Sequence, residues 1–521
     1  MKKTPSHLTD QYLPGTPRMA QTGWGICKVS TTRSTRRCFS VAARIAGSSA
    51  VLVLLLFGLV TACHAGPAQV APGSRPNFIV IFTDDQGYAD VSAFGGTHVD
   101  TPNIDRMAEE GMMLTRFYVA APLCSPSRAA LMTASYPIRN DMAYGSDFMV
   151  LLAADSKGLH PDEITLAEVL RDAGYRTGLF GKWHLGDQPG FLPGRQGFDE
   201  FFGIPYSHDI HPQNGKASAA GYHFPPLPLM RNETVIATDP DADLLTRRMT
   251  EEAIQFIERH ASEPFFLYLA HPLPHEPIHV SPPFMQDVGR TTKDKLAREN
   301  TATTVDYLTR RELYPQAIRE IDWSVGRILG TLKELGLDER TLVVFTSDNG
   351  PVVGSAAPFR GRKGSTYEGG MREPSVVRWP GTLPSGTTND ELLTAMDLLP
   401  TFAYLAGGEV PQDRVLDGKN VWPVLAEAQH SPHRYFFYYF QNDLQAVSGR
   451  KWKLHLREGE GTELYDLEAD PSESKNLLSQ HPDKAAELLE QAKAFELSLQ
   501  DSSRPAGYVE SPVPLTQSAD R

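Results

Sequence analysis

The sequence predicts an α/β fold in which a large, mixed but mostly parallel sheet is flanked by helices and followed by a smaller antiparallel sheet with one helix. Two observations predict the large sheet: four apolar, β-rich runs recur along the chain, and polar side chains follow each run at once. A third observation predicts the small sheet, because after about residue 430 the sequence changes to short strand-like runs and turns.

The first apolar run covers residues 78–82 and is followed by Asp84 and Asp85. It is continuously apolar, as expected of a strand buried on both faces. The other three runs, with the polar residues that end them, are 174–186 with Lys182 and His184, 264–277 with His271 and His275, and 341–350 with Asp348 and Asn349.

Each of these three later runs follows a predicted helix, at 164–173, about 249–261 and 314–335 respectively. Carboxyl ends of parallel strands meet at one edge of a sheet, so we expect the site along that edge. A TIM barrel would also collect residues there, but the long irregular stretches 185–245 and 275–312 fit its regular repeats poorly.

The chain is too long for one average domain, so we expect a large domain over 76–430 and a small α+β domain over 431–501. The small domain closes with a helix at 482–499 that is rich in Ala, Glu, Leu and Lys. Residues 502–521 are expected to form a loose tail.

Residues 1–62 are typical of an export signal, because four arginines precede an apolar run, 50–60, that is too short to span a bilayer comfortably. The segment VTAC resembles a bacterial lipobox, with Cys63 as the lipidated first residue of the mature chain, and TRRCF resembles a twin-arginine motif. We therefore expect an exported protein of the periplasm or cell envelope, anchored by lipid, with 63–75 as a tether. An ordinary signal peptide and an uncleaved anchor are the alternatives.

The charge of the chain argues against a nucleic-acid surface. Eight of the 50 basic side chains but only one of the 63 acidic ones lie in residues 1–62, so the remainder has a net charge of −20. Such a chain has little with which to displace counterions from phosphates. A local cluster of cations could still attract a small anion.

The cysteine content singles out one residue. Of the four cysteines, Cys27 and Cys38 leave with the signal and Cys63 is the expected lipid site, which leaves Cys124. No internal disulfide is then possible, and a lone thiol in an oxidising compartment is expected to be buried or used.

The polar residues that end the strands suggest a cation site. Three carboxylates and an amide would repel one another or remain unpaired unless they surround a hard cation. Ligation by oxygen alone favours Ca²⁺ or Mg²⁺ over Zn²⁺. The candidate ligands are Asp84, Asp85, Asp348 and Asn349.

Basic residues near glycines suggest an anion site beside these acids. Lys182 and His184 end one strand, and Arg128 and Lys363 lie in CSPSR and GRKGS. Fixed positive charge and close backbone approach at the glycines around Lys363 would suit an oxygen-rich anion. Alone, GRKGS would be interpreted as a solvated basic loop.

Several motifs together resemble the sulfatase family. CSPSRAALMT and GYRTGLFGKWHLG resemble its two signatures, and NFIVIFTDDQGYAD, TPNIDRMAEEG, TSDNG, KGSTYEGGMREP and LYDLEADPSESKNL resemble other motifs in the family's order. GIPYSHD and FFLYLAHPLPHEP are most similar to the arylsulfatase A branch. The resemblance covers roughly residues 76–480 and implies an alkaline-phosphatase-like fold, with 76–430 as the catalytic domain.

The resemblance implies hydrolysis of a small sulfate ester, aryl or carbohydrate, by a formylglycine that a formylglycine-generating enzyme makes from Cys124. One hydroxyl of the hydrated aldehyde attacks sulfur, and the other then expels sulfate. Ca²⁺, in preference to Mg²⁺, would be held by Asp84, Asp85, Cys124, Asp348 and Asn349, with Asp348 also helping to deprotonate the nucleophile. The remaining implied roles are positioning by Arg128 and Lys182, proton acceptance by His184, sulfate and leaving-oxygen contacts by His275 and Lys363, and further substrate contacts by Lys182 and Ser207.

The sequence departs from the family pattern at two places. MTAS replaces the usual LTGR after the cysteine motif, with Ala134 for glycine and Ser135 for a basic residue, which puts efficient conversion of Cys124 in doubt. Phe180 replaces a small residue and is interpreted as local packing. We interpret the extra histidines His208, His271 and His279 as structural.

Two other functions are compatible with the same residues. A phosphonate or phosphodiester hydrolase of the same superfamily could use the same site, since one site can stabilise either transferring anion. If Cys124 is not converted, the protein would instead be a non-catalytic lipoprotein that binds sulfated glycans. The sequence does not identify the alcohol that carries the sulfate.

Overall fold

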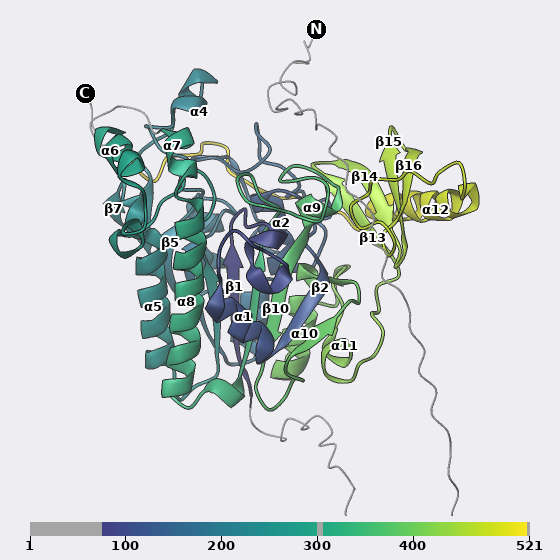
Figure 1. Ribbon diagram of the computed structural model, residues 1–521, viewed down its shortest axis with the longest axis horizontal. Coiled ribbons are helices and arrows are strands. Elements are labelled where there is room, and N and C mark those ends of the chain that lie inside the picture. The colour runs from purple at the N-terminus through teal and green to yellow at the C-terminus, as the bar shows by residue number, and fades with distance from the viewer. Residues whose placement is uncertain (1–74, 300–305, 518–521) are drawn as a thin grey trace, which may run out of the picture. The chain divides into compact units, whose positions relative to one another are not determined.

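A computed structural model describes residues 75–299 and 306–517 of the chain (Figure 1). Its larger sheet has the strand order β11-β2-β10-β9-β1-β8-β4-β5-β6-β7, with β12 also paired to β2. The five strands at its centre are mutually parallel. They are β9 (Thr341–Ser347), β1 (Asn77–Thr83), β8 (Phe265–Ala270), β4 (Arg176–Lys182) and β5 (Glu200–Ile204).

The outer strands make the sheet mixed, because β10 is antiparallel to both β9 and β2, and β6 is antiparallel to β5 and β7. The predicted mixed, mostly parallel sheet is therefore confirmed. The outer strands are β2 (Met112–Tyr118), β10 (Arg372–Arg378), β11 (Thr387–Asn389), β12 (Leu393–Thr394), β6 (Pro228–Arg231) and β7 (Thr234–Thr238).

The central strands are apolar on both faces because helices cover both faces of the sheet. In β1, Ile79 and Ile81 belong to one buried cluster, with α1 (Pro102–Glu109), α5 (Leu245–Arg259) and α8 (Tyr314–Glu334), which lie side by side in Figure 1. The alternate residues of β1 belong to a second cluster, with α2 (Cys124–Thr133), α3 (Leu166–Asp172) and α10 (Leu398–Ala406). The period of two along the strand thus separates two cores.

The three helices predicted before strands are present as α3, α5 and α8, with ends within a few residues of the predicted ones. A capping box defines the start of α3: the Thr165 hydroxyl accepts from the Glu168 N–H at 3.1 Å, and the Glu168 carboxylate accepts from the Thr165 N–H at 2.8 Å. The shorter helices are α4 (Gly215–Ala219), α6 (Arg290–Glu299), α7 (Tyr307–Arg311), α9 (Glu368–Met371) and α11 (Trp422–Ala426).

The second sheet is antiparallel, in the order β13-β14-β15-β16, and α12 (Pro482–Leu499) packs on it, as predicted. Its strands are β13 (Phe436–Phe440), β14 (Asp443–Ser448), β15 (Trp452–Arg457) and β16 (Glu460–Asp466). Phe495 of α12 stacks on Phe437 of β13, with ring centroids 4.0 Å apart. Apolar residues of this sheet continue one of the two cores of the large sheet.

The segment after α12 pairs with a short strand of the large domain in a separate two-stranded sheet, so the prediction of a loose tail is corrected. β17 (Gly507–Tyr508) pairs with β3 (Lys157–Gly158), and the Arg504 guanidinium is bonded to the buried Glu163 carboxylate at 2.6 Å. Sequence reasoning missed this contact because two-residue strands leave no periodic pattern.

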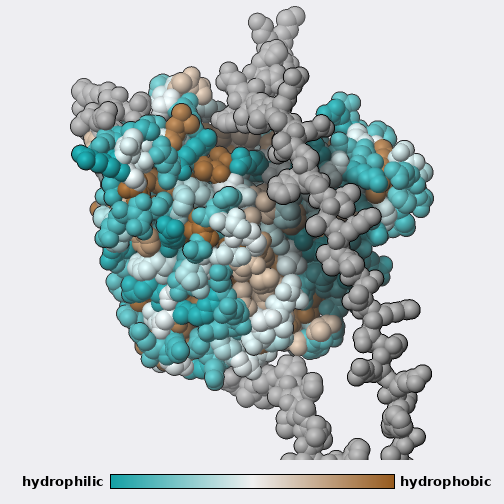
Figure 2. Space-filling model, in the orientation of Figure 1, coloured by the Kyte–Doolittle hydropathy of each residue, from teal (hydrophilic) through white to brown (hydrophobic). Residues whose placement is uncertain are grey.

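The predicted export signal, lipid site and most of the tether, residues 1–74, lie outside the described residues. Among residues 75–299 and 306–517, no helix has the length and apolar character needed to cross a membrane. The face in Figure 2 is mostly hydrophilic, with hydrophobic residues in small scattered groups.

Replacing Arg504 by Ala is predicted to lower the free energy of unfolding by about 1–3 kcal/mol, because the buried Glu163 carboxylate loses two charge-assisted hydrogen bonds and keeps, among the described residues, only the Arg414 guanidinium, 3.6 Å away, as a charged partner. Denaturant unfolding measures the change. The matched control is Arg176→Ala, which removes an exposed ion pair with Glu263 and should cost about 0–1 kcal/mol. Equal costs in the two variants would contradict an anchoring role for the tail.

Candidate active site

The carboxyl ends of the parallel strands bring the predicted polar residues together. Asp84 and Asp85 follow β1, Asp348 and Asn349 follow β9, and Lys182 ends β4. β1 lies between β9 and β8, and β8 is followed by β4, so residues far apart in sequence meet at one edge. The structure therefore confirms that these polar residues lie close together at the carboxyl edge of the sheet.

Cys124 is the first residue of α2 and is almost completely buried, with 2% of its surface exposed. The Lys363 ammonium donates to its Sγ at 3.4 Å. Burial raises the pKa of the thiol to about 11, although Lys182 and Lys363 oppose that shift. At neutral pH this side chain is a protonated thiol, which is a poor nucleophile and a poor metal ligand.

Three buried oxygens of the candidate cation ligands have no hydrogen-bond partner in the part of the chain that the structure describes. They are Asp84 Oδ1, Asp85 Oδ2 and Asn349 Oδ1. Ligand atoms of Asp84, Asp85, Cys124 and His275 all lie within 4.8 Å of one another. Leaving such atoms unpaired in a buried site is costly, and oxygen donors of this kind are the preferred ligands of Ca²⁺ and Mg²⁺. The residues present therefore fit a hard divalent cation.

Asp348 is engaged differently from the other acids. Its Oδ2 accepts from Arg128 Nη2 at 2.7 Å and from Nε at 3.1 Å, and its Oδ1 accepts from the Asp85 N–H at 3.1 Å. Burial and the nearby Asp84 carboxylate raise the pKa of Asp348 to about 7. Asp348 can thus exchange a proton near neutral pH.

Lysines pair with the remaining acids. Lys182 Nζ contacts Asp84 Oδ2, and Lys363 Nζ lies 2.6 Å from Asp85 Oδ1. Burial would raise the pKa of Asp84, but the charge of Lys182, with His275 and Arg128, holds it well below its usual range. The Asp84 carboxylate therefore stays ionised and available to a cation.

His184 lies in a left-handed turn, with φ of 63°, just after β4. Its Nε2 is 2.8 Å from the Leu151 carbonyl oxygen, which can only accept, so Nε2 carries the proton. Its buried Nδ1 has no hydrogen-bond partner among the described residues. Burial and the charge of Lys182 hold the pKa of His184 well below its usual value, so Nδ1 is a neutral proton acceptor.

His275 and Ser207 are placed less tightly. His275 donates from Nδ1 to the Glu276 carbonyl oxygen at 2.6 Å, which leaves Nε2 3.7 Å from Asp85 Oδ2. Ser207 is buried, with 3% of its surface exposed.

The extra histidines make structural contacts. His208 Nε2 bonds the Pro277 carbonyl oxygen at 2.9 Å, and His271 bonds the Ser324 hydroxyl of α8 at 3.0 Å. His279 Nδ1 bonds Asp243 at 2.6 Å.

Comparison with known proteins identifies the family. The family model described as Sulfatase matches residues 76–408, and the model described as N-sulphoglucosamine sulphohydrolase, C-terminal, matches 362–498. The chain belongs to the sulfatase family. Sulfatases of this kind are sulfuric ester hydrolases, so the protein is an enzyme that hydrolyses sulfate esters.

Proteins similar to this chain match it over most of its length. Rat (Rattus norvegicus) steryl-sulfatase is 36% identical over 78% of this chain and 78% of its own length. Human (Homo sapiens) arylsulfatase A is 36% identical over 84% of this chain and 90% of its own length. The crystal structure of the PsFucS1 sulfatase from Pseudoalteromonas sp. superposes with a TM-score of 0.70 at 26% identity and covers 82% of this chain and 91% of that one.

The two departures from the family pattern have local explanations in this sulfatase. Ala134 ends α2 in the left-handed region, with φ of 53°, where glycine would avoid a cost of about 1 kcal/mol. Ser135 is buried and accepts from Arg504 at 3.4 Å, so an arginine of the tail reaches this position. Phe180 is buried against Phe256, as the packing interpretation requires.

Sequence reasoning missed the residues that bond the Lys363 segment to the C-terminal sheet, above all Glu368 and Lys453. Glu368 lies within a motif quoted for the family, but its buried partner comes from β15, 85 residues later. A lysine that alternates with apolar residues in a short strand-like run was the available signal, since lysine is seldom fully buried without a charged partner.

Removing divalent cations is predicted to lower the melting temperature, because the three unpartnered oxygens lose their cation. A cation at 100 times its Kd contributes about 2.7 kcal/mol of stability. Differential scanning calorimetry with chelator, and then with added Ca²⁺ or Mg²⁺, measures the shift. Asn349→Ala should show a smaller Ca²⁺-dependent shift than the parent protein. An unchanged melting temperature after complete metal removal would rule out the cation site.

Proposed function

We propose that this sulfatase cleaves aryl or carbohydrate sulfate esters with a formylglycine made from Cys124 and with a bound divalent cation. One observation supports this above the others: a buried thiol with a raised pKa lies beside Lys363 and within reach of carboxylates whose oxygens lack partners. As a protonated thiol the side chain would be a weak nucleophile, and conversion to formylglycine would account for its place in the charge cluster.

Hydrated formylglycine at position 124 would supply two hydroxyls on one carbon, one to attack sulfur and one to expel sulfate. Ca²⁺, in preference to Mg²⁺, would supply Lewis acidity that polarises the nucleophile and the sulfate oxygens. The residues suited to hold the cation are Asp84, Asp85 and Asn349 together with position 124. Asp348 is suited to join them through Oδ1, which now accepts only a backbone N–H.

Two groups of the chain are suited to move protons. Asp348, with its pKa near 7, is suited to take the proton of the attacking hydroxyl. His184, with an unpartnered Nδ1, is suited to take the proton whose loss releases sulfate. Arg128 orients Asp348 through two nitrogens and bonds the Lys182 carbonyl oxygen at 3.0 Å, so it links the acid after β9 to the end of β4.

Substrate binding falls to the partly accessible side of the site. Lys363 and His275 retain 15% and 14% of their side-chain surface exposed, whereas Lys182 and Arg128 retain none. Lys363 and His275 are therefore suited to contact sulfate and the leaving oxygen, with Ser207 as a further sulfate contact. Lys182 and Arg128 are suited to hold the nucleophile in position from the buried side of the site.

Maturation requires a formylglycine-generating enzyme as a partner, and the substrate is a small sulfate ester. A phosphonate or phosphodiester would have to use the same cations, so relative turnover of aryl sulfate and aryl phosphonate distinguishes the two reactions. A non-catalytic glycan-binding protein would require Cys124 to remain unconverted.

Cys124→Ala is predicted to fold normally and to have no detectable turnover of an aryl sulfate, because alanine cannot form the hydrate. Peptide mass spectrometry of the parent protein should detect a form in which residue 124 is lighter than cysteine. The fraction of chains in that form should be proportional to the specific activity. Near-parent activity in the alanine variant, or full activity with unmodified cysteine, would overturn the mechanism.

For the N-terminus we propose a lipid anchor at Cys63, with residues 64–75 as a tether to an envelope or periplasmic location. The net charge of −20 beyond residue 62 would be repelled by anionic lipid, so the protein surface should not replace the acyl chains. At least two chains are needed for stable anchoring.

Cys63→Ala is predicted to release active enzyme from membranes, because Cys63 lies far in sequence from the residues of the site. Fractionation followed by an aryl sulfate assay measures both properties. Retention of the variant in the membrane fraction would show that residues 50–60 act as an uncleaved anchor and that the lipid assignment is wrong.

A further inference from the structure

The lysine loop, defined here as residues 360–368, joins Lys363 in the active site to α9. Lys363 Nζ is 3.4 Å from Cys124 Sγ and 2.6 Å from Asp85 Oδ1. The Gly364 N–H donates to the Pro122 carbonyl oxygen at 2.9 Å, two residues before Cys124. One side of the loop therefore faces the reacting position.

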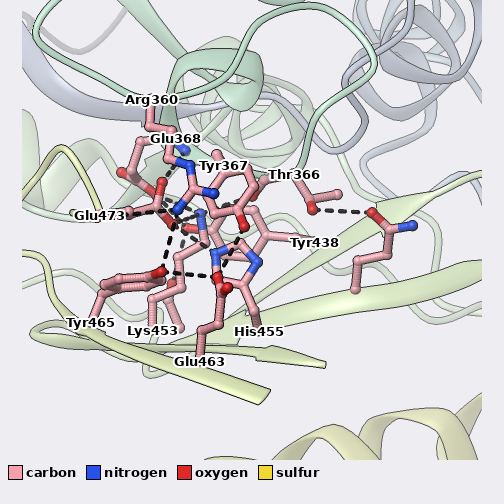
Figure 3. Close-up of polar contacts among 12 residues, drawn as sticks. Arg360, Thr366, Tyr367, Glu368, Tyr438, Lys453, His455, Glu463, Tyr465 and Glu473 are labelled. Carbon is pink, nitrogen blue, oxygen red and sulfur yellow. Dashed lines mark hydrogen bonds and ion pairs between the residues drawn. The ribbon is translucent and has the colours of Figure 1, made fainter. Parts of the chain in front are cut away.

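The other side of the lysine loop is bonded to the C-terminal sheet (Figure 3). Lys453 of β15 donates to the Thr366 carbonyl oxygen at 2.8 Å and to Glu368 Oε1 at 2.9 Å, and it lies 3.0 Å from Glu473 Oε1. Glu473 Oε2 in turn accepts from the Glu368 N–H at 2.7 Å. The side chains of Lys453, Glu368 and Glu473 have no exposed surface.

Strand alternation directs several side chains of the sheet at the loop. Lys453 and His455 of β15 share one face, and their cross-strand partners Tyr465 and Glu463 of β16 share it with them. The ring of His455 lies 4.3 Å from that of Tyr367, whose hydroxyl donates to Glu463 at 2.9 Å. The opposite face packs against α12. Several side chains on one face of the small sheet therefore contact the lysine loop.

The charges in this contact are balanced. Lys453 and Arg372 oppose Glu368 and Glu473. Burial would raise the pKa of Glu368, but Lys453 and Arg372 lower it to about 2, so it is ionised. Buried ion pairs add little stability over well-packed apolar residues, yet each demands a defined geometry from its partners. Such a contact is better suited to fixing the position of a loop than to joining two domains.

We propose that the C-terminal sheet positions Lys363: Lys453, bonded to Thr366 and Glu368, sets the place of the Lys363 ammonium beside position 124. Lys453 touches no reacting atom and is a positioning residue. The proposal rests on the proposed function only in giving Lys363 a role at the leaving oxygen and the sulfate.

The test is Lys453→Met, which keeps the length of the side chain and removes its charge. If Lys363 is displaced, kcat should fall at least about tenfold for an unactivated phenyl sulfate and about twofold for a nitrophenyl sulfate, whose leaving oxygen needs less help. If Lys453→Met does not fold, the double variant Lys453→Met, Glu473→Gln is used in its place, because it removes one buried charge of each sign.

Two controls separate positioning from stability. Lys451→Met makes the same substitution two residues away, where the lysine is 45% exposed and pairs with Asp466, and both substrates should be turned over as by the parent. Leu488→Ala, in α12 on the opposite face, lowers the melting temperature without touching the loop and should leave the ratio of the two kcat values unchanged.

Two further measurements decide the proposal. In a Lys363→Ala background, Lys453→Met should lower kcat by less than about twofold, because the group it positions is gone. In the inactive Cys124→Ala protein, Lys453→Met should weaken binding of inorganic sulfate, measured by calorimetry, by nearly the same factor as Lys363→Ala. Equal loss on both substrates, additive effects or unchanged sulfate binding would overturn the proposal. A parent protein that turns over no sulfate ester would instead overturn the proposed function.

Discussion

Two buried ion pairs at the carboxyl edge of the parallel strands hold the active site together. Arg128 of α2 pairs with Asp348 after β9, and Lys182 at the end of β4 pairs with Asp84 after β1. All four side chains are fully buried, where an isolated charge would cost several kcal/mol. The relative positions of α2 and the three strands are therefore constrained by charge as well as by apolar packing.

These ion pairs, together with Lys363 and Asp85, also set the net charge of the site. Three carboxylates, Asp84, Asp85 and Asp348, are opposed by the cations of Arg128, Lys182 and Lys363, so the cluster is close to neutral. A divalent cation in the site would leave a positive excess, which an anionic sulfate group can neutralise. The partnerless oxygens mark where the cation belongs.

The C-terminal sheet is part of this arrangement. Its apolar residues continue one core of the large sheet, and its polar face holds the loop that carries Lys363. A description of the chain as a catalytic domain with an appended small domain understates this connection. The same contact explains why Lys453, in a short strand, can be fully buried as a charged side chain.

The sequence by itself determined the strand ends and hence the acids, since continuous apolar runs such as 78–82 and 342–345 are buried parallel strands whose carboxyl ends meet at one edge of the sheet. It also singled out Cys124, the helix boundaries and the family. Only the tertiary structure decided which charge opposes which, because Arg128 and Asp348 are 220 residues apart and no local pattern pairs them. The docked tail and the contact of Lys453 with the lysine loop were likewise decided by tertiary structure. They depend on single side chains meeting across the fold, whereas periodicity reports only which face of an element is buried.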